Sequence, residues 1–238
     1  MVVDKFTGYR TEVDAQKLNP GDAPNGQNTT ANQTDRISVR NLGYDLLPST
    51  GTASSSAVKV ESIHTFRKRD GENVLMRTYG QYLEYFEEGN DTWELLNNSY
   101  TSSDFGFADY NINTDLTSYV YFGNAVENFS KWNGAHSLTS VALSGGEATV
   151  SVGNTAGFSS IGTIIYCGTT STYSGKTASA FTISGGTANA CAISKGVAQW
   201  VETSSTNPKG NIYMVADNRL FIAGVTSSTQ MIQFSAYG

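Results

Sequence analysis

The chain has 238 residues, 11% of them aromatic and 15% charged, and this length indicates one large domain or two small ones. Its formal net charge of −6 argues against a general nucleic-acid binder, because phosphate binding depends on clustered Lys and Arg. The one dense basic run, residues 67–69, is interpreted as a solvated strand end. The sequence contains no apolar run of about 18 residues, so no membrane span is predicted.

Two features bear on the compartment in which the protein is made. Asp4 and Lys5 stand where a secretory signal peptide would carry its apolar segment. We therefore expect the chain to be made and kept in the cytoplasm unless an assembly carries it out. Cys167 and Cys191, the only cysteines, could pair, but two cysteines in a chain of this length make no disulfide scaffold, and we expect free, partly buried thiols.

Residues 1–57 are predicted to form an extended N-terminal arm and linker. Residues 19–26 are rich in turn-forming residues and show no core-forming pattern. Residues 34–40 are predicted to form one strand, with Ile37 and Val39 on the same face. An arm of this size without its own core is either disordered or ordered by a neighbour.

Four apolar side chains in the arm, Leu42, Tyr44, Leu46 and Leu47, are expected to anchor it where it docks. Residues 49–57, which contain mainly Ser, Thr and Ala, have the composition of a linker. The arm therefore depends on contacts outside its own sequence.

A meander of four antiparallel strands is predicted next, because turns too short for a crossover helix separate four β-prone runs. The runs are residues 58–68, 73–79, 81–87 and 92–96. Asp70-Gly71, Gly80 and Gly89 can supply the positive φ values of tight turns. The third run carries aromatic residues on both faces, as a sheet packed between two others requires. Trp93 lies in the fourth run, and the whole unit resembles a propeller blade.

A second meander is predicted to be interrupted by an inserted module. Its first three strands are residues 105–111, 118–123 and 125–132, the last ending at Trp132. Asn133-Gly134 is the strongest two-residue hairpin signal in the chain. Residues 135–195 are rich in small residues and nearly free of charge, and we interpret them as a small β module inserted at this hairpin. Residues 197–203 are then the missing fourth strand, with Trp200 in the place that Trp93 takes in the first unit.

A third unit is predicted from residues 211–216, 219–224 and 229–234, with a turn at Asp217-Asn218. The fold class expected is therefore all-β, with blade-type meanders in residues 58–134 and 196–238. Three units, the last incomplete, cannot close a ring, since closed propellers have about four to eight blades. The chain is expected to be a piece of a longer protein, or its sheets stack on other chains.

The sequence offers few candidate catalytic residues. His64 and His136 are far apart and lack metal-ligand spacing, so we interpret them as half-buried packing residues. Glu84, Glu87 and Glu88 cluster near a turn and are assigned to a solvated face, because catalytic carboxylates must face each other across a cleft. No catalytic, cofactor-binding or metal-binding residue is predicted, and no cofactor.

Four stretches of the sequence, residues 17–44, 74–96, 119–134 and 207–224, carry a resemblance, and the last of them, NPKGNIYMVADNRLFIAG, is the most recognisable. They resemble tail structural proteins of bacteriophages, specifically the propeller-bearing nozzle or tail-tube-end proteins of short-tailed phages. Residues 151–183 are similar to small β inserts of phage tail proteins. The resemblance implies a non-enzymatic virion protein, assembled in the host cytoplasm, that acts as a ring of identical subunits in the tail. Implied partners are copies of itself, other tail proteins and the genome DNA passing through a lumen.

Seven residues are predicted to serve structure or assembly, and the list is Trp93, Trp132, Trp200, Asn133, Gly134, Tyr44 and Leu46. An acidic lumen would repel DNA phosphates and let the genome slide past. The alternative function is a receptor- or glycan-binding tail module, in which Tyr166, Tyr173 and Phe181 stack on sugar rings or, instead, pack a core. A hydrolase of the sialidase type is disfavoured for want of an arginine cluster and an acid/base pair.

Overall fold

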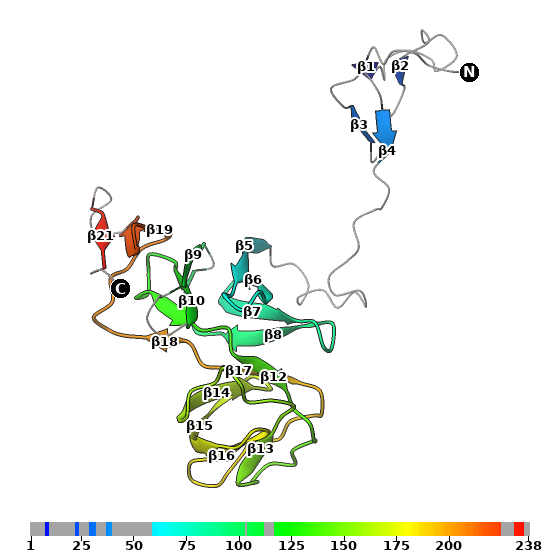
Figure 1. Ribbon diagram of the computed structural model, residues 1–238, viewed down its shortest axis with the longest axis vertical. Coiled ribbons are helices and arrows are strands. Elements are labelled where there is room, and N and C mark those ends of the chain that lie inside the picture. The colour runs from blue at the N-terminus through cyan, green and yellow to red at the C-terminus, as the bar shows by residue number, and fades with distance from the viewer. Residues whose placement is uncertain are drawn as a thin grey trace. The chain divides into compact units, whose positions relative to one another are not determined.

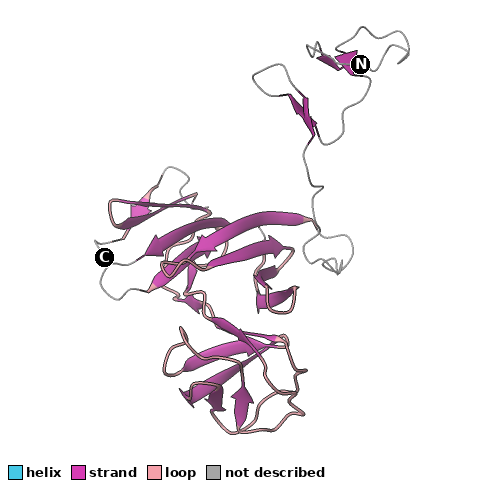
Figure 2. Ribbon diagram, turned by 45° about the vertical axis from the view of Figure 1, so that its right-hand side comes forward, coloured by secondary structure: helices cyan, strands magenta, loops and turns pink. Residues whose placement is uncertain are grey.

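The computed structural model describes residues 59–102, 104–111, 117–224 and 231–235, together with the backbone of four short strands nearer the N-terminus. The chain divides into two compact units, Met1–Ser49 and Thr50–Gly238. Regular structure in the described residues consists of strands, without a helix (Figure 2). The all-β prediction is therefore confirmed.

In the unit Met1–Ser49, the described residues form two small two-stranded sheets. β1 (Gly8–Tyr9) pairs in parallel with β2 (Asp22–Ala23), and β3 (Thr29–Ala31) pairs antiparallel with β4 (Ile37–Val39). β4 lies within the strand predicted at residues 34–40. The predicted anchors Leu42, Tyr44, Leu46 and Leu47 lie outside the described residues.

The first large sheet is the predicted antiparallel meander, in the order β5-β6-β7-β8. Its strands are β5 (Val60–Arg67), β6 (Asn73–Tyr79), β7 (Tyr82–Glu87) and β8 (Thr92–Asn97). Gly71 and Gly80 take positive φ values of 94° and 55° at the first two turns. At the third turn Asp91 takes the positive φ, 53°, in place of the expected Gly89.

The second sheet has the order β18-β11-β10-β9 and is antiparallel. Its strands are β9 (Gly106–Asn111), β10 (Ser118–Gly123), β11 (Ser130–Trp132) and β18 (Glu202–Thr203). The single strand expected at residues 197–203 divides in two, so that expectation was wrong. β17 (Gly196–Gln199) is buried along its whole length and pairs with strands of the inserted module, which leaves Glu202 and Thr203 to complete this sheet.

The inserted module is a six-stranded sheet with the order β12-β17-β14-β15-β16-β13. Its other strands are β12 (His136–Leu138), β13 (Thr149–Ser151), β14 (Gly162–Tyr166), β15 (Thr169–Lys176) and β16 (Ala180–Ile183). Asn133-Gly134 does not close a hairpin, because β11 pairs with β10 and β18 whereas β12 pairs with β17. The chain instead crosses from one sheet to another at these two residues.

Cys167 and Cys191 form a disulfide, with their Cα atoms 5.7 Å apart, so the expectation of free thiols was wrong. One cysteine lies in a turn and the other in a bridge to a residue distant in the sequence. Cys167 takes a positive φ of 46° in the turn between β14 and β15, and Cys191 forms an isolated bridge with Leu143 at the edge of the module.

The third sheet has the order β19-β20-β21. Its strands are β19 (Ile212–Ala216), β20 (Arg219–Ala223) and β21 (Gln233–Phe234). Asp217 and Asn218 both take positive φ, 49° and 53°, as a tight two-residue hairpin turn requires and as the sequence predicts.

The three sheets stack, with the second between the other two (Figure 1). Val120 and Phe122 on one face of the second sheet are fully buried in a cluster with Phe66 and Met76 of the first. On the opposite face, Ala108 joins the buried side chains of the third sheet. A second cluster of buried residues forms the core of the inserted module, which lies below the stack in Figure 1.

Candidate assembly site

The second and third sheets approach each other backbone to backbone. A Cβ atom built on Gly106 would lie 1.9 Å from the carbonyl oxygen of Asn211, and one on Gly123 would lie 2.3 Å from the Tyr213 hydroxyl. Tyr213 donates that hydroxyl to the carbonyl of Gly210 at 2.8 Å, and burial raises the pKa of Tyr213. Glycine is therefore required where the sheets meet.

The outer face of the first sheet carries an ion pair among aromatic rings. Arg77 donates from Nη2 to Glu84 Oε2 at 2.7 Å, and Tyr79 donates its hydroxyl to Glu84 Oε1 at 2.7 Å. The Arg77 guanidinium lies 4.1 Å from the ring centroid of Trp93, whose ring meets Phe86 edge-on. Burial, followed by the hydrogen bond to Glu84, raises the pKa of Tyr79. The assignment of Glu84 to a solvated face was therefore wrong.

The outer face of the third sheet exposes apolar side chains to solvent. Ile212 is 60% exposed, Met214 55% and Phe234 61%. Phe221 pairs with Phe234 across the neighbouring strands, with ring centroids 6.0 Å apart. Arg219 lies over the Phe234 ring at 5.3 Å. An apolar face of this kind is typical of a surface that binds another protein.

A pocket of about 460 Å³ opens between the second and third sheets beside β21. Phe129 and Pro208 line it on the side of the second sheet, and Leu220 and Ile222 on the side of the third. The pocket therefore continues the apolar core between these two sheets, to which Leu220 and Ile222 belong.

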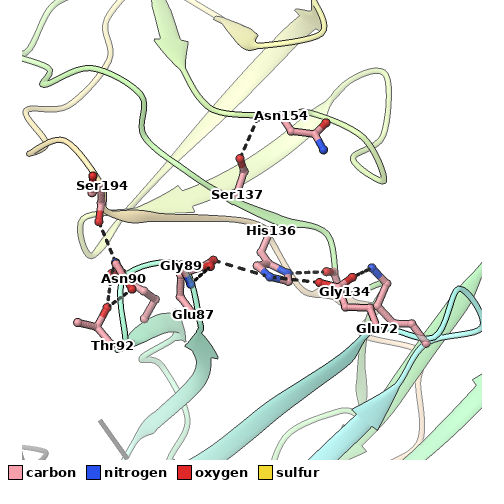
Figure 3. A network of polar contacts seen from close by, with 12 residues as sticks. Glu72, Glu87, Gly89, Asn90, Thr92, Gly134, His136, Ser137, Asn154 and Ser194 are labelled. Atoms are coloured by element: carbon pink, nitrogen blue, oxygen red, sulfur yellow. Dashed lines mark hydrogen bonds and ion pairs between the residues drawn. The ribbon is translucent and has the colours of Figure 1, made fainter. Parts of the chain in front are cut away.

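A seam of polar contacts joins the first sheet to the inserted module (Figure 3). His136 Nδ1 lies 2.9 Å from the carbonyl oxygen of Gly134, and its Nε2 lies 3.5 Å from Glu72 Oε1 and 3.7 Å from Glu87 Oε2. Glu87 is buried, so its assignment to a solvated face was also wrong, whereas Glu88 is exposed as expected.

The seam continues at the next turn of the first sheet. Asn90 donates from Nδ2 to the carbonyl of Ser194 at 2.8 Å. Behind this seam, burial, followed by the charges of Glu87 and Glu94, raises the pKa of the Tyr85 hydroxyl. The module is thus fastened to the first sheet at two places, so we interpret these carboxylates as structural.

The predicted tryptophans lie in three different environments. Trp132 is 1% exposed and its ring packs between Phe66 and Tyr85, with centroid distances of 6.3 and 5.5 Å. Trp93 is half-buried on the outer face of the first sheet, and Trp200 is half-buried against the core of the stack. They therefore form no common site.

Asn133 and Gly134 shape the crossing into the module. Asn133 donates to the carbonyl of Gly157 at 3.0 Å and accepts the Ala135 N–H at 3.0 Å. Gly134 takes a φ of +75°, and a Cβ there would lie 2.8 Å from Phe66. Both residues therefore have structural roles, although they do not form the predicted hairpin.

The aromatic residues expected to stack on sugars are core residues of the module. Tyr166 and Tyr173 are each 1% exposed and Phe181 is fully buried. Tyr173 donates its hydroxyl to Gln199 Oε1 at 3.0 Å. Their use as a glycan platform is therefore excluded, and the alternative reading, core packing, is the one that the structure shows.

His64 is half-buried on the first sheet, as the sequence predicts. Its Nε2 lies 2.7 Å from Asp109 Oδ1, and its ring stacks on Phe107 with centroids 4.9 Å apart. In the described ranges, no group of three or more His, Cys, Asp or Glu side chains is arranged to hold a metal ion. No helix suited to crossing a membrane occurs in the same part of the chain.

Sequence reasoning missed the two outer faces. For the third sheet a signal was present in residues 212–215, where Ile212 and Met214 alternate with Tyr213 and Val215, so that both faces of the strand are apolar.

Comparison of the chain with protein-family models, with curated proteins and with solved structures gave no match.

Proposed function

We propose that this chain is a structural, non-enzymatic assembly component whose stacked sheets act as blades of a propeller-like ring. The observation that supports the proposal is the position of the second sheet, which buries apolar side chains against a sheet on each side. The third sheet also buries one face against the second sheet, but its outer face is apolar and exposed. A stack of this kind is extended by a further sheet on that face.

The sequence resemblance suggests where such a component acts. We propose a bacteriophage tail, with the chain in a nozzle or tail-tube-end ring around the DNA exit path. Its partners there are copies of itself and other tail proteins, and its place is the virion. The net charge of −6 suits a lumen through which DNA passes without adhering, because like charges repel.

Glycan binding is not part of this proposal. The three aromatic residues that suggested it, Tyr166, Tyr173 and Phe181, are buried. The exposed apolar residues of the third sheet instead favour protein as the partner, since exposed apolar side chains are stabilised by burial against another apolar face.

The test is the mass of the purified full chain, measured by light scattering over a range of concentrations and followed by electron microscopy. We expect closed oligomers of uniform size. Replacing Met214 by Asp should abolish them, because it places a charge on the exposed face of the third sheet.

The matched control is Ile161→Asp, at a similarly exposed apolar residue of the inserted module. This variant should assemble like the wild type. A chain that remains monomeric at every concentration, or equal loss of assembly in both variants, would contradict the proposal.

A further inference from the structure

A row of side chains crosses three strands of the second sheet. Tyr121 of β10 pairs directly with Lys131 of β11, and Lys131 pairs directly with Glu202 of β18. Because directly opposed residues of adjacent strands have their side chains on the same face, these three share one face of the sheet. On the other side of Tyr121, the row ends at Ala108 of β9, which is buried against the third sheet. The third sheet therefore covers that end of the row, whereas the side chains of Lys131 and Glu202 remain 31% and 55% exposed.

A pocket of about 320 Å³ lies at the uncovered end of this row. Its aromatic lining is Tyr121 and Phe129, which are both half-buried and whose ring centroids are 5.9 Å apart. Its polar lining includes Lys131 and Glu202 of the row, together with Ser204 and Asn207 from the segment that follows β18. Two aromatic rings, an ammonium, a carboxylate, a hydroxyl and an amide therefore meet in one small pocket.

Backbone and side-chain hydrogen bonds hold the wall of this pocket in place. Asn207 donates from Nδ2 to the carbonyl of Phe129 at 2.9 Å. Phe129 in turn donates its N–H to the carbonyl of Pro208 at 3.0 Å. The segment after β18 is thus fastened to the start of β11. A pocket whose walls are fixed before binding loses less conformational entropy when a ligand enters it.

The two charges in the pocket compensate each other. Lys131 Nζ lies 3.0 Å from Glu202 Oε2, and it also lies 4.4 Å from the ring centroid of Tyr119. The pair presents a donor and an acceptor side by side without a net charge. A phosphate group would be attracted by Lys131 and repelled by Glu202, so an anion gains little here. The pocket is therefore suited to a neutral ligand that both donates and accepts hydrogen bonds.

We propose that this pocket binds a pyranose ring of a neutral saccharide. The C–H groups on the face of a pyranose pack against the electron-rich face of an aromatic ring, which Tyr121 and Phe129 supply. The hydroxyls project from the edge of the pyranose, and each can donate and accept. Glu202 accepts from these hydroxyls and Lys131 donates to them. The volume lies at the lower end of the range for small-molecule sites, about 300–1,000 Å³, and so suits a short stretch of a glycan.

This site is distinct from the aromatic residues that the sequence suggested for sugar binding. Those residues, Tyr166, Tyr173 and Phe181, belong to the buried core of the inserted module. Tyr121 and Phe129 belong to the stack of sheets, and the pocket that they line is open. The inference also does not depend on ring formation, because every residue of the pocket comes from a single chain.

A glycan array incubated with the tagged full chain tests the inference. We expect binding to oligosaccharides that carry no sulfate, phosphate or carboxylate, and saturable binding when the best of them is titrated in solution. Glu202→Ala should weaken that binding about tenfold, because the ligand loses a hydrogen bond to a charged acceptor. Tyr121→Leu should weaken it by a similar factor, because it keeps an apolar side chain but removes the aromatic face. Glu202→Ala should melt at the wild-type temperature, because this side chain is 55% exposed.

The matched control is Glu61→Ala, at the exposed ion pair in which Lys59 Nζ lies 3.0 Å from Glu61 Oε2. This variant should bind the oligosaccharide like the wild type. The inference is overturned if no neutral oligosaccharide binds saturably, or if only anionic glycans bind. It is also overturned if Glu202→Ala binds as tightly as Glu61→Ala. Because the oligomeric state is measured separately, failure of saccharide binding leaves the proposed function standing, and failure of ring assembly leaves this site standing.

Discussion

Arg77 and Glu84 face each other on adjacent strands of the first sheet, with Nη2 2.7 Å from Oε2 and side chains only 10% and 11% exposed. Both charges have lost most of their water, and each is compensated by the other. The pair therefore adds little net stability over apolar residues, but neither member can be removed alone without cost.

Replacing Arg77 by Met should lower the free energy of unfolding by about 3–5 kcal/mol, because Glu84 is left buried without its counter-ion. The double variant Arg77→Met/Glu84→Leu should recover most of the loss. Urea denaturation at neutral pH measures both. Lys131→Met is the control at the more exposed pair Lys131–Glu202, where a change below about 1 kcal/mol is expected. Equal losses of unfolding free energy in Arg77→Met and Lys131→Met would contradict the prediction.

Replacing Gly106 by Ala should separate the third sheet from the second. The new Cβ would meet the backbone of Asn211, which cannot move as a side chain can. Overpacking of this kind costs about 1–3 kcal/mol or more. Hydrogen exchange should show faster exchange in β19 and β20. Gly175→Ala, where a Cβ has no neighbour within 4 Å, is the control and should leave exchange in these strands unchanged.

Removing the Cys167–Cys191 disulfide should destabilise the inserted module. The two residues are separated by 24 positions, and a loop of that length gives a stabilisation of about 3.5 kcal/mol in the chain-entropy model. The double variant Cys167→Ser/Cys191→Ser should melt at a lower temperature than the wild type, and a reducing agent should lower only the wild-type value. A thiol assay on the unfolded, unreduced wild type that finds two free thiols would refute the disulfide.

Acid should destabilise the loop that connects the first two sheets. Burial alone would raise the pKa of Glu127. Thr101 donates to Glu127 Oε1 from its N–H at 2.9 Å and from its hydroxyl at 2.5 Å. Hydrogen bonds of this kind outweigh the burial, so the pKa of Glu127 is lowered. A carboxyl whose pKa is lower in the folded state contributes stability above its unfolded pKa of about 4.3. That contribution is lost as the pH falls from there through the folded value.

Melting temperatures measured between neutral and acidic pH test this carboxyl. Glu127→Gln should reduce the loss of stability in acid, and Thr101→Val should reduce it too, because it removes a donor to the ionised form. Acid profiles identical to the wild type in both variants would show that Glu127 does not carry the effect.

Much of the strand order was predictable because its signals are local. Asp70-Gly71 and Asp217-Asn218 set tight turns by their own backbone preferences, so the meanders around them follow from a few neighbouring residues. The strands with which residues 196–199 pair cannot be predicted from the neighbouring sequence alone. This segment joins the module because β12 and β14 offer it a ladder on both edges and bury all four residues.

The candidate site was predictable only in part, for a similar reason. Trp132 was predicted to serve structure or assembly, and it is buried between Phe66 and Tyr85. Glu84 was misassigned to a solvated face because charged side chains are usually exposed. Only the register of β6 against β7 shows that Arg77 lies opposite it. Cysteine pairing likewise depends on the distant bridge between Leu143 and Cys191.

The inserted module also forms part of the wall of the main core. Ile165 and Ala198 belong to the same buried cluster as Phe66, Met76 and Trp132. Excising the module and rejoining the chain would expose that cluster to solvent and leave a cavity lined with apolar side chains. A different domain grafted at this point would have to supply two apolar side chains in the places of Ile165 and Ala198.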